Sequence, residues 1–304
     1  MSVLVVGSVA LDTVETPFGR VEEALGGSAV YIALSAGYFT APVRIVAVVG
    51  GDFPKKEVEL LENRNIDLDG LQVIEEGKTF RWSGRYHYDL NTRDSLYTHL
   101  NVFEKFNPVI PDGYKKSSYV CLGNIDPVLQ KKVLEGIEKP RLVVGDTMNY
   151  WIKNKPKELR ETLKVMDVIV LNDSETRLLT GEPNLIKAAK RIIEMGPRIV
   201  IIKKGEHGAV LVTSNVIFSA PAYPLEDIQD PTGAGDVFAG GFIGWLAKTD
   251  DLSIENLKRA VIYGSTLASF SVEQFSVNGL TDLTPLKIQD RFRTFMRISK
   301  FDEQ

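Results

Sequence analysis

The residues best suited to chemistry lie within one short segment, residues 230–241, which reads DPTGAGDVFAGG. The small residues Gly233, Ala234 and Gly235 let the backbone turn sharply, so that several N–H groups point into one small space. A helical pattern follows, and the partial positive charge at a helix N-terminus attracts anions. The carboxylate of Asp236 lies at this turn. The segment therefore predicts chemistry on a charged group, with Asp236 accepting a proton.

A helix cap or a dinucleotide-binding loop could also contain a segment of this composition. An Asp after a glycine-rich turn is typical of a cap, but each Gly inside a helix costs about 1 kcal/mol relative to Ala. Gly240, Gly241 and Gly244 therefore indicate a further constraint, such as close packing behind a ligand. A dinucleotide-binding loop requires an apolar strand before its glycines, whereas the preceding PLEDIQDPT is polar. The chain also contains no GxxxxGK[ST] phosphate loop.

The segments that must position this turn are of two alternating kinds. Short apolar runs such as VLVVG, RLVVGD and VIVLN are separated by amphipathic segments such as NLIKAAKRIIEMG. This alternation is typical of a parallel sheet covered by helices on both faces. Ligands of such sheets bind outside the carboxyl ends of the strands. The polar residues expected at these ends are Asp12, Asn124, Asp146, Asn172, Lys203 and Lys204.

One stretch breaks the alternation and predicts a hairpin over about residues 79–103. In TFRWSGRYHYD, aromatic residues occupy one set of alternate positions, and polar residues, including Arg81 and Arg85, occupy the other. A period of two indicates a half-exposed strand, which could belong to a static edge hairpin or to a lid. For a lid, the polar face could contact the substrate. The aromatic face could stack on a nucleobase, although packing onto the domain is favoured; packing onto the lid of a second subunit is an open alternative.

Five segments of the chain, in order, resemble those of the ribokinase-like (PfkB) carbohydrate and nucleoside kinases. These segments are VLVVGSVALD, ALGGSAVYIALSAGY, VIVLNDSETRLLTG, IVIIKKGEHGAVLV and DPTGAGDVFAGGF, and the resemblance spans about residues 1–285. It implies an α/β, ribokinase-like three-layer fold with a mostly parallel central sheet, flanking helices and a small β-sheet lid. We expect residues 1–304 to form a single domain, with the lid built from about residues 12–20 and 77–103.

The resemblance also implies roles in phosphoryl transfer, which requires alignment, charge neutralisation and a base. It makes Asp236 the general base and the backbone of residues 233–235 the anion hole. It assigns Asn172 and Glu175 to Mg²⁺ and the nucleotide phosphates, with Glu175 as the metal-binding residue. Spacing alone instead favours Glu175 as a stabilising charge in the first turn of a helix.

The resemblance places further residues beside ATP. Lys203 and Gly205 follow the strand IVII and border the nucleotide, although Lys203 could instead belong to a solvated pair with Lys204. Thr232, together with Asp230, lies where some members of the family bind a monovalent cation such as K⁺. We therefore expect ATP and Mg²⁺ as cofactors, with K⁺ as a further candidate.

The acceptor side departs from the usual family pattern. Asp12 ends the first strand, where the resemblance implies hydrogen bonds to substrate hydroxyls. Gly26 and Gly27 would let the substrate approach the backbone, and the lid would add Arg81 as a substrate-binding residue. Many family members have GGxxxN, whereas this chain has GGSAVY, with Tyr31 in place of the Asn. A usual hydroxyl contact is therefore missing or replaced by a phenol.

The sequence predicts an ATP- and Mg²⁺-dependent kinase that phosphorylates a primary hydroxyl of a small sugar. An adenosine-like nucleoside kinase is the alternative within the same family. A non-catalytic ligand-binding protein is a third hypothesis, which the intact Asp236 disfavours. An ADP-dependent donor is a minority alternative.

Composition and charge limit the classes of partner and the cellular compartment that we expect for this protein. The formal charge of −4 and the scattered lysines and arginines give no basic surface for a nucleic acid. The single cysteine, Cys121, excludes an intrachain disulfide and fits a reducing compartment. The sequence shows no signal peptide, and no apolar stretch approaches the roughly 20 residues that span a bilayer. We expect a cytoplasmic protein without a membrane or nucleic-acid partner, and a homodimer through the lid is a further hypothesis.

Overall fold

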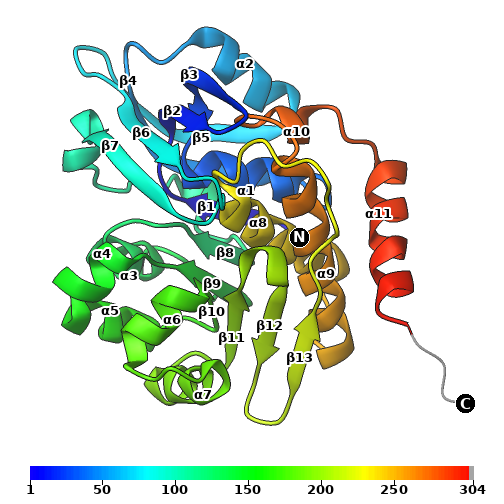
Figure 1. Cartoon of the computed structure of the whole chain (residues 1–304). Coiled ribbons are helices and arrows are strands. Elements are labelled where there is room, and N and C mark those ends of the chain that lie inside the picture. Colours follow the sequence, from blue (N-terminus) through cyan, green and yellow to red (C-terminus); the bar gives the residue numbers. More distant parts are fainter. Residues whose placement is uncertain (301–304) are drawn as a thin grey trace, which may run out of the picture.

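A large central sheet organises the computed structural model, which describes residues 1–300 (Figure 1). Most neighbouring strands of this sheet are parallel, and only the last two strands at one edge pair antiparallel. The α/β fold with a mostly parallel sheet is therefore confirmed. In their order across the sheet, the strands are β13 (Ile217–Ala220), β12 (Ala209–Val212), β11 (Ile199–Lys203), β10 (Val168–Asn172), β9 (Leu142–Asp146), β8 (Tyr119–Leu122), β1 (Val3–Val6), β4 (Val43–Gly50) and β5 (Ile66–Ile74).

Helices cover both faces of the central sheet, as the alternating sequence pattern predicts. Alternate side chains of β1 enter different cores: Val3 and Val5 pack on one side, and Leu4 and Val6 pack on the other. The first core takes side chains from α1 (Ser28–Gly37), α2 (Lys55–Asn63), α8 (Ala234–Thr249), α9 (Ile254–Ser271), α10 (Asn278–Thr281) and α11 (Pro285–Ile298). The second takes them from α3 (Pro127–Glu135), α4 (Asn149–Asn154), α5 (Pro156–Leu163), α6 (Asp173–Thr180) and α7 (Leu185–Met195).

A second, four-stranded sheet contains both segments that the sequence predicts for a lid. Its order is β3 (Gly19–Gly26), β2 (Ala10–Thr16), β6 (Phe80–Tyr86) and β7 (Arg93–His99). Strands β6 and β7 form the predicted antiparallel hairpin, and β6 pairs in parallel with β2. A 3₁₀ helix, η1 (Asn101–Lys105), follows β7. Figure 1 shows this small sheet in the upper part of the view, above the strands β9–β13. Its movement as a lid stays a prediction.

The interior glycines of α8 are explained by helix packing. A Cβ on Gly240 would lie 2.3 Å from the carbonyl oxygen of Ile32, and one on Gly244 would lie 2.7 Å from the Cα of Ala36, both in α1. On the other side, a Cβ on Gly241 would lie 3.0 Å from the Cα of Gly264 in α9. These glycines therefore let three helices pack closely, and they do not form the wall of a ligand site. This packing fixes α8, and with it the glycine-rich turn at its N-terminus.

No helix within residues 1–300 is both long enough and apolar enough to span a membrane.

Candidate active site

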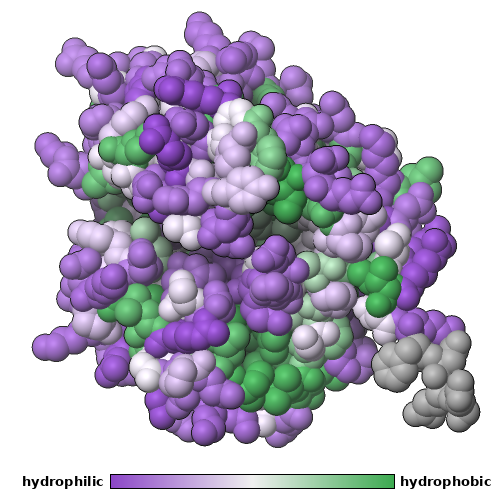
Figure 2. Space-filling view, in the orientation of Figure 1, coloured by the Kyte–Doolittle hydropathy of each residue, from purple (hydrophilic) through white to green (hydrophobic). Residues whose placement is uncertain are grey.

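The carboxyl ends of the central strands and the small sheet enclose a cavity of about 1320 Å³. Figure 2 shows this face of the molecule hollowed near its middle. Gly26 and Arg81 lie outside the residues that line the cavity. The other predicted site residues all line it: Asp12, Gly27, Tyr31, Asn172, Glu175, Lys203, Gly205, Thr232, Gly233, Ala234, Gly235 and Asp236.

The glycine-rich turn forms a cradle at the start of α8. Gly233 has a left-handed backbone with φ of 75°, and no side chain within residues 1–300 caps the helix there. A Cβ on Gly233 would lie 2.4 Å from the ring of Tyr31, and a Cβ on Gly235 would lie 2.5 Å from Nζ of Lys203. The backbone conformation and the Tyr31 ring therefore require glycine at position 233, whereas a side chain at position 235 would displace the ammonium group of Lys203. The N-terminus of this 16-residue helix lines the cavity, which suits an anion such as a phosphate.

Asp236 lies in the first turn of α8 with one oxygen unsatisfied. Its Oδ1 is shielded from solvent and has no hydrogen-bond partner among residues 1–300. Burial and the negative charge of Asp146 raise the pKa of Asp236 to about 7. The positive charges of Lys203 and Arg93 oppose this shift. A buried carboxylate with a free oxygen and a pKa near neutrality has the properties of a general base.

Lys203 brings a positive charge from the end of β11 to the cradle. Its Nζ lies 3.8 Å from Oδ2 of Asp146, and its side chain is 19% exposed. Burial alone would lower the pKa of Lys203, but the carboxylates of Asp146, Glu175 and Asp236 raise it. The alternative of a solvated lysine pair is therefore wrong for Lys203. Its ammonium group lies where it can neutralise a phosphate held by the turn.

Asn172 and Glu175 form a capping box at the start of α6. The side-chain Oδ1 of Asn172 accepts a hydrogen bond from the backbone N–H of Glu175 at 2.8 Å, and Oε2 of Glu175 accepts one from the backbone N–H of Asn172 at 2.9 Å. Glu175 thus has the helix-end role that spacing alone favours. Burial and the charge of Asp146 also raise its pKa to about 7. Glu175 also lines the cavity, so its carboxylate can stabilise the start of α6 and also face a bound ligand.

Asp12 and two glycines form the opposite end of the site. Burial and the charge of Asp230 raise the pKa of Asp12 to about 7. A Cβ on Gly26 would lie 2.1 Å from Oδ2 of Asp12, and Gly27 has φ of 95° with its Cβ direction blocked by the carbonyl of Ser8 at 2.4 Å. Gly26 therefore makes room for the carboxylate of Asp12, although Gly26 itself does not line the cavity. Gly27 forms part of the wall itself.

Asp230 and Thr232 hold the turn from behind. Oδ1 of Asp230 accepts a hydrogen bond from the backbone N–H of Thr232 at 2.8 Å, and Oδ2 accepts one from that of Ser276 at 3.1 Å. The hydroxyl of Thr232 donates to the phenol oxygen of Tyr86 at 3.3 Å, which joins the turn to the small sheet. K⁺ binding near these residues stays a prediction.

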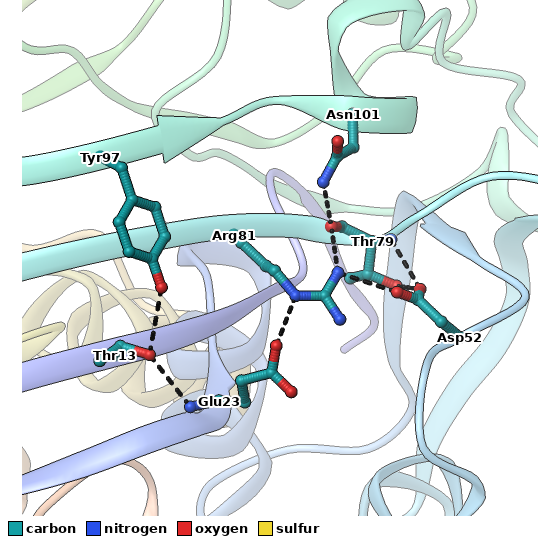
Figure 3. A network of polar contacts seen from close by, with 7 residues as sticks. All are labelled: Thr13, Glu23, Asp52, Thr79, Arg81, Tyr97 and Asn101. Atoms are coloured by element: carbon teal, nitrogen blue, oxygen red, sulfur yellow. Dashed lines mark hydrogen bonds and ion pairs between the residues drawn. The ribbon is translucent and has the colours of Figure 1, made fainter.

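Arg81 belongs to a network on the outer side of the small sheet (Figure 3). Its Nε donates to Oε1 of Glu23 at 2.7 Å, and its Nη1 donates to Oδ2 of Asp52 at 2.8 Å. Asp52 also accepts hydrogen bonds from the backbone and hydroxyl of Thr79. The structure therefore does not place Arg81 with the other predicted substrate-binding residues. Its charge is used to hold β6 against β3 and the loop after β4.

The aromatic face of the hairpin, and not its polar face, is the one that lines the cavity. Phe80, Trp82 and Tyr88 are among the lining residues, and Phe103 from η1 joins them. The rings of Phe80 and Phe103 stack with their centroids 5.4 Å apart. The polar face, for which substrate contacts were considered, does not line this cavity, because acidic partners on the same sheet, such as Glu15 for Arg85, hold that face outside.

Two residues of the cavity, Arg93 and Trp151, were missed from the sequence. Arg93 begins β7, two residues before the apolar run by which the second strand can be recognised. Because Arg93 directly follows a turn, no periodicity in the sequence indicated that this residue would line the cavity. Trp151 lies in α4, and its Nε1 donates to Oδ1 of Asn124 at 2.9 Å. Asn124 itself follows β8, where a polar residue was expected but had no assigned role.

Comparison with known proteins identifies the family. The model of the pfkB family carbohydrate kinases matches residues 2–282. The chain belongs to the PfkB family. It is therefore a phosphotransferase with an alcohol group as acceptor, and the predicted family membership is confirmed.

Similar PfkB proteins include kinases that act on nucleosides. The chain is 32% identical to a cytidine kinase of Thermococcus kodakarensis, over 82% of this chain and 89% of that protein. It is 26% identical to a nucleoside kinase of Methanothermobacter thermautotrophicus, over 85% of this chain and 81% of that protein.

Solved structures show the same ribokinase-like fold. A nucleoside kinase of Methanocaldococcus jannaschii matches with a TM-score of 0.76 and 21% identity, covering 96% of this chain and 98% of that one. An E. coli protein described as ribokinase II, in complex with ATP and Mg²⁺, matches with a TM-score of 0.78 and 19% identity, covering 98% of this chain and 99% of that one. At these identities the likeness establishes the fold.

Proposed function

We propose that this PfkB protein is a nucleoside kinase that uses ATP and Mg²⁺ to phosphorylate the primary hydroxyl of a ribonucleoside. The observation that carries the proposal is the aromatic lining of the cavity near Asp12. Asp12 and Trp82 are direct partners on the parallel strands β2 and β6, so their side chains emerge side by side on the same face. Stacking of a nucleobase on an aromatic ring is worth about 1–3 kcal/mol. A free sugar has no aromatic base that could stack in this way. The names of two relatives, a cytidine kinase and a nucleoside kinase, support the same acceptor class.

The ribose would bind between the carboxylate of Asp12 and the backbone at Gly27. A carboxylate accepts hydrogen bonds from hydroxyl groups, and Gly27 lines the cavity. The base would then extend toward Trp82, Phe80 and Phe103. We therefore propose a nucleoside as the acceptor, which was the alternative drawn from the sequence, in place of the small sugar that the sequence favoured.

The size of the cavity supports two substrates. A pocket for one drug-sized ligand measures about 300–1,000 Å³, whereas this cavity measures about 1320 Å³. Its second half, lined by Gly205, Gly208, Tyr223 and Ser269, would take the nucleotide, with its phosphates directed to the cradle at residues 233–235. The E. coli relative with bound ATP and Mg²⁺ supports ATP as the donor.

The residues present fit a phosphate-bound Mg²⁺. Mg²⁺ keeps several waters and needs only one or two carboxylates from the protein. Glu175 would hold it, because its carboxylate lines the cavity and has one oxygen outside the capping box. When bound with ATP, Mg²⁺ supplies charge neutralisation on the phosphates.

Asp236 would take the proton of the acceptor hydroxyl through its unsatisfied Oδ1. The hydroxyl oxygen then forms a bond to the γ-phosphorus of ATP, and the bond from this phosphorus to the bridging oxygen breaks, with its electron pair leaving on ADP. The N–H groups of residues 233–235 and the ammonium of Lys203 would hold the phosphoryl oxygens.

A substrate panel tests the proposal directly. Purified protein is incubated with ATP, Mg²⁺ and one acceptor at a time: cytidine, uridine, adenosine, inosine, ribose or fructose. ADP release is measured, and the product is identified by mass and by ³¹P NMR. We expect at least one nucleoside to give a 5′-monophosphate with a higher kcat/KM than either sugar. A free sugar that exceeds every nucleoside would overturn the proposal and leave a sugar kinase.

A further inference from the structure

Arg93 brings a positive charge from the small sheet into the cavity that contains Asp236. It is the first residue of β7, and it lines the cavity. Its Nη1 donates a hydrogen bond to the phenol oxygen of Tyr86 at 3.2 Å, and its guanidinium lies 5.3 Å from the centre of the Trp82 ring. Tyr86 is itself buried and accepts a hydrogen bond from Thr232, next to the cradle. Two contacts on its own sheet thus fix the direction of the Arg93 side chain.

The charged residues that interact with Arg93 are ones to which we assign roles in the reaction. Arg93 is exposed, like the rest of β7, but the cavity walls partly desolvate it. This desolvation alone would lower its pKa, but Tyr86 and the carboxylates of Glu175 and Asp236 raise it. Its own charge in turn lowers the pKa of Asp12 and of Asp236. Arg93 is therefore close enough to the donor, acceptor and base residues to interact electrostatically with all three.

Arg93 differs from the other arginines of its hairpin in having no carboxylate partner of its own. Arg81 forms ion pairs with Glu23 and Asp52, and Arg85 forms one with Glu15 at 3.0 Å. Within residues 1–300, no acidic side chain lies within ion-pair distance of Arg93. A guanidinium carries five N–H donors, and one of them is used by Tyr86. The remaining donors are available to an anionic ligand.

We propose that Arg93 is a catalytic residue, which donates hydrogen bonds to the phosphoryl group during its transfer. As the acceptor oxygen forms its bond to the γ-phosphorus and the bond to the bridging oxygen breaks, negative charge is spread over the transferring group and the departing ADP. The proton of the acceptor goes to Asp236, and Arg93 keeps its own protons throughout. A planar guanidinium matches two phosphoryl oxygens at once. The group is then held between the cradle and Lys203 on one side and Arg93 on the other.

Tyr86 acts as a positioning residue in this arrangement. Its phenol oxygen contacts both Arg93 and Thr232, so it links the small sheet to the turn that forms the cradle. Arg93 therefore reaches its place only when the small sheet lies against this turn. The proposal rests on the phosphotransferase activity and does not require a nucleoside acceptor.

The test compares Arg93→Ala with Arg85→Ala as a matched control. Both changes remove an arginine from the same hairpin, but Arg85 is paired with Glu15 outside the cavity. The assay is ADP release with saturating ATP and Mg²⁺, with cytidine as acceptor, or ribose if the wild-type enzyme prefers it. We expect kcat to fall by on the order of 10²-fold or more for Arg93→Ala and to stay within about twofold for the control.

Three further measurements separate catalysis from folding and binding. Millimolar guanidinium should restore part of the turnover of Arg93→Ala, without effect on the control. Arg93→Lys should keep the unfolding temperature of the wild-type protein but recover only part of kcat, because an ammonium lacks the two-pronged geometry. Tyr86→Phe should lower kcat by a smaller factor than Arg93→Ala. A kcat within threefold of wild type for Arg93→Ala, or a raised KM with unchanged kcat, would overturn the proposal.

Discussion

Asp236 combines burial, an unsatisfied oxygen and a place beside the cradle. Asp236→Asn keeps the size of the side chain and removes its basicity, so turnover should fall by on the order of 10²-fold or more. ATP affinity should be retained, because the contacts proposed for the phosphates come from backbone N–H groups and Lys203 and not from Asp236. Turnover and the Kd of ATP, by calorimetry, are measured on the same preparation. A variant that turns over within a few-fold of wild type, with ATP affinity unchanged, would exclude Asp236 as the base.

The raised pKa of Asp236 also fixes the direction of the pH dependence. With a pKa of about 7, the carboxylate is protonated at lower pH and cannot accept the acceptor proton. We therefore expect kcat/KM to rise as the pH is raised through about 7 and to level off above it. The measurement is kcat/KM from pH 5 to 9 in buffers of constant ionic strength. A profile that is flat across this range would contradict the assignment.

The same pKa has a consequence for stability. An Asp in an unfolded chain ionises near pH 3.9, so between about pH 4 and 7 the folded state holds a proton that the unfolded state has lost. Wild-type stability therefore falls over this range because of Asp236. Asp236→Asn should unfold at a higher temperature than wild type at pH 8, with a smaller difference at pH 5. Calorimetry of both proteins at the two pH values checks this, and an equal difference at both would refute it.

Tyr31 is the residue at which this chain departs from the family pattern. It is 2% exposed at the cavity wall, and its ring packs against Gly233 of the cradle. Tyr31→Asn should change the order of preferred acceptors more than the KM of ATP, because the ring lines the cavity that also contains Asp12. Acceptor ranking in the substrate panel provides the measurement. If the ranking stays fixed while the unfolding temperature drops, Tyr31 serves packing only.

The cradle could be predicted at residue resolution, and Arg93 could not. Residues 233–236 are adjacent in sequence, so their glycines and carboxylate determine a local geometry. Arg93 and Thr232 are far apart in sequence and meet only through Tyr86 on the neighbouring strand. Contacts of this kind depend on how two sheets are placed against each other, which no short pattern contains.

Among the secondary-structure elements, the β6–β7 hairpin shows what periodicity can and cannot determine. The alternation of aromatic and polar residues correctly predicts a two-faced strand. It does not say which face meets the cavity, because that depends on acidic partners from β2, β3 and the loop after β4. Strand β5 shows how a contact between strands accommodates acidic residues in a sheet. It contains Asp67 and Asp69, and Asp67 lies 3.8 Å from Arg44 on the neighbouring strand, which accommodates an acid in the sheet.

The small sheet should close over the acceptor. Its hairpin contributes cavity residues, and β7 is exposed along its whole length. Closure would exclude water and so limit wasteful hydrolysis of ATP. Backbone amides in residues 79–103 should therefore become protected from hydrogen exchange when the acceptor binds. Unchanged protection there, together with clear protection near Asp12 and Gly27, would show that the hairpin is a static edge.

At the scale of the whole molecule, the C-terminal helix supports a wall of the nucleotide half of the cavity. The guanidinium of Arg291 in α11 lies 3.4 Å from the ring centre of Phe270 and 4.5 Å from that of Tyr223, and it pairs with Glu273 at 3.0 Å. Tyr223 lines the cavity. A residue far from the cradle in sequence thus holds a ring beside the expected nucleotide.

Arg291→Met should therefore raise the KM of ATP and leave the KM of the acceptor nearly unchanged. Arg293→Met is the matched control, because Arg293 pairs with Asp290 on the exposed side of the same helix. Steady-state kinetics with each substrate varied in turn gives both constants. Equal changes in the two KM values, or a comparable effect of the control, would show that α11 contributes only general stability.

The placement of the tryptophans gives the protein a built-in optical reporter. Of the three in the sequence, Trp82 and Trp151 line the cavity, one from the small sheet and one from α4, whereas Trp245 stacks on Tyr263 between α8 and α9. Indole emission responds to hydration, to a stacked base and to a nearby guanidinium such as that of Arg93. Two variants, each keeping Trp245 and only one of the two cavity tryptophans, Trp82 or Trp151, would therefore report arrival at the two sides of the cavity separately. Stopped-flow fluorescence could then time substrate entry and sheet closure without any attached dye.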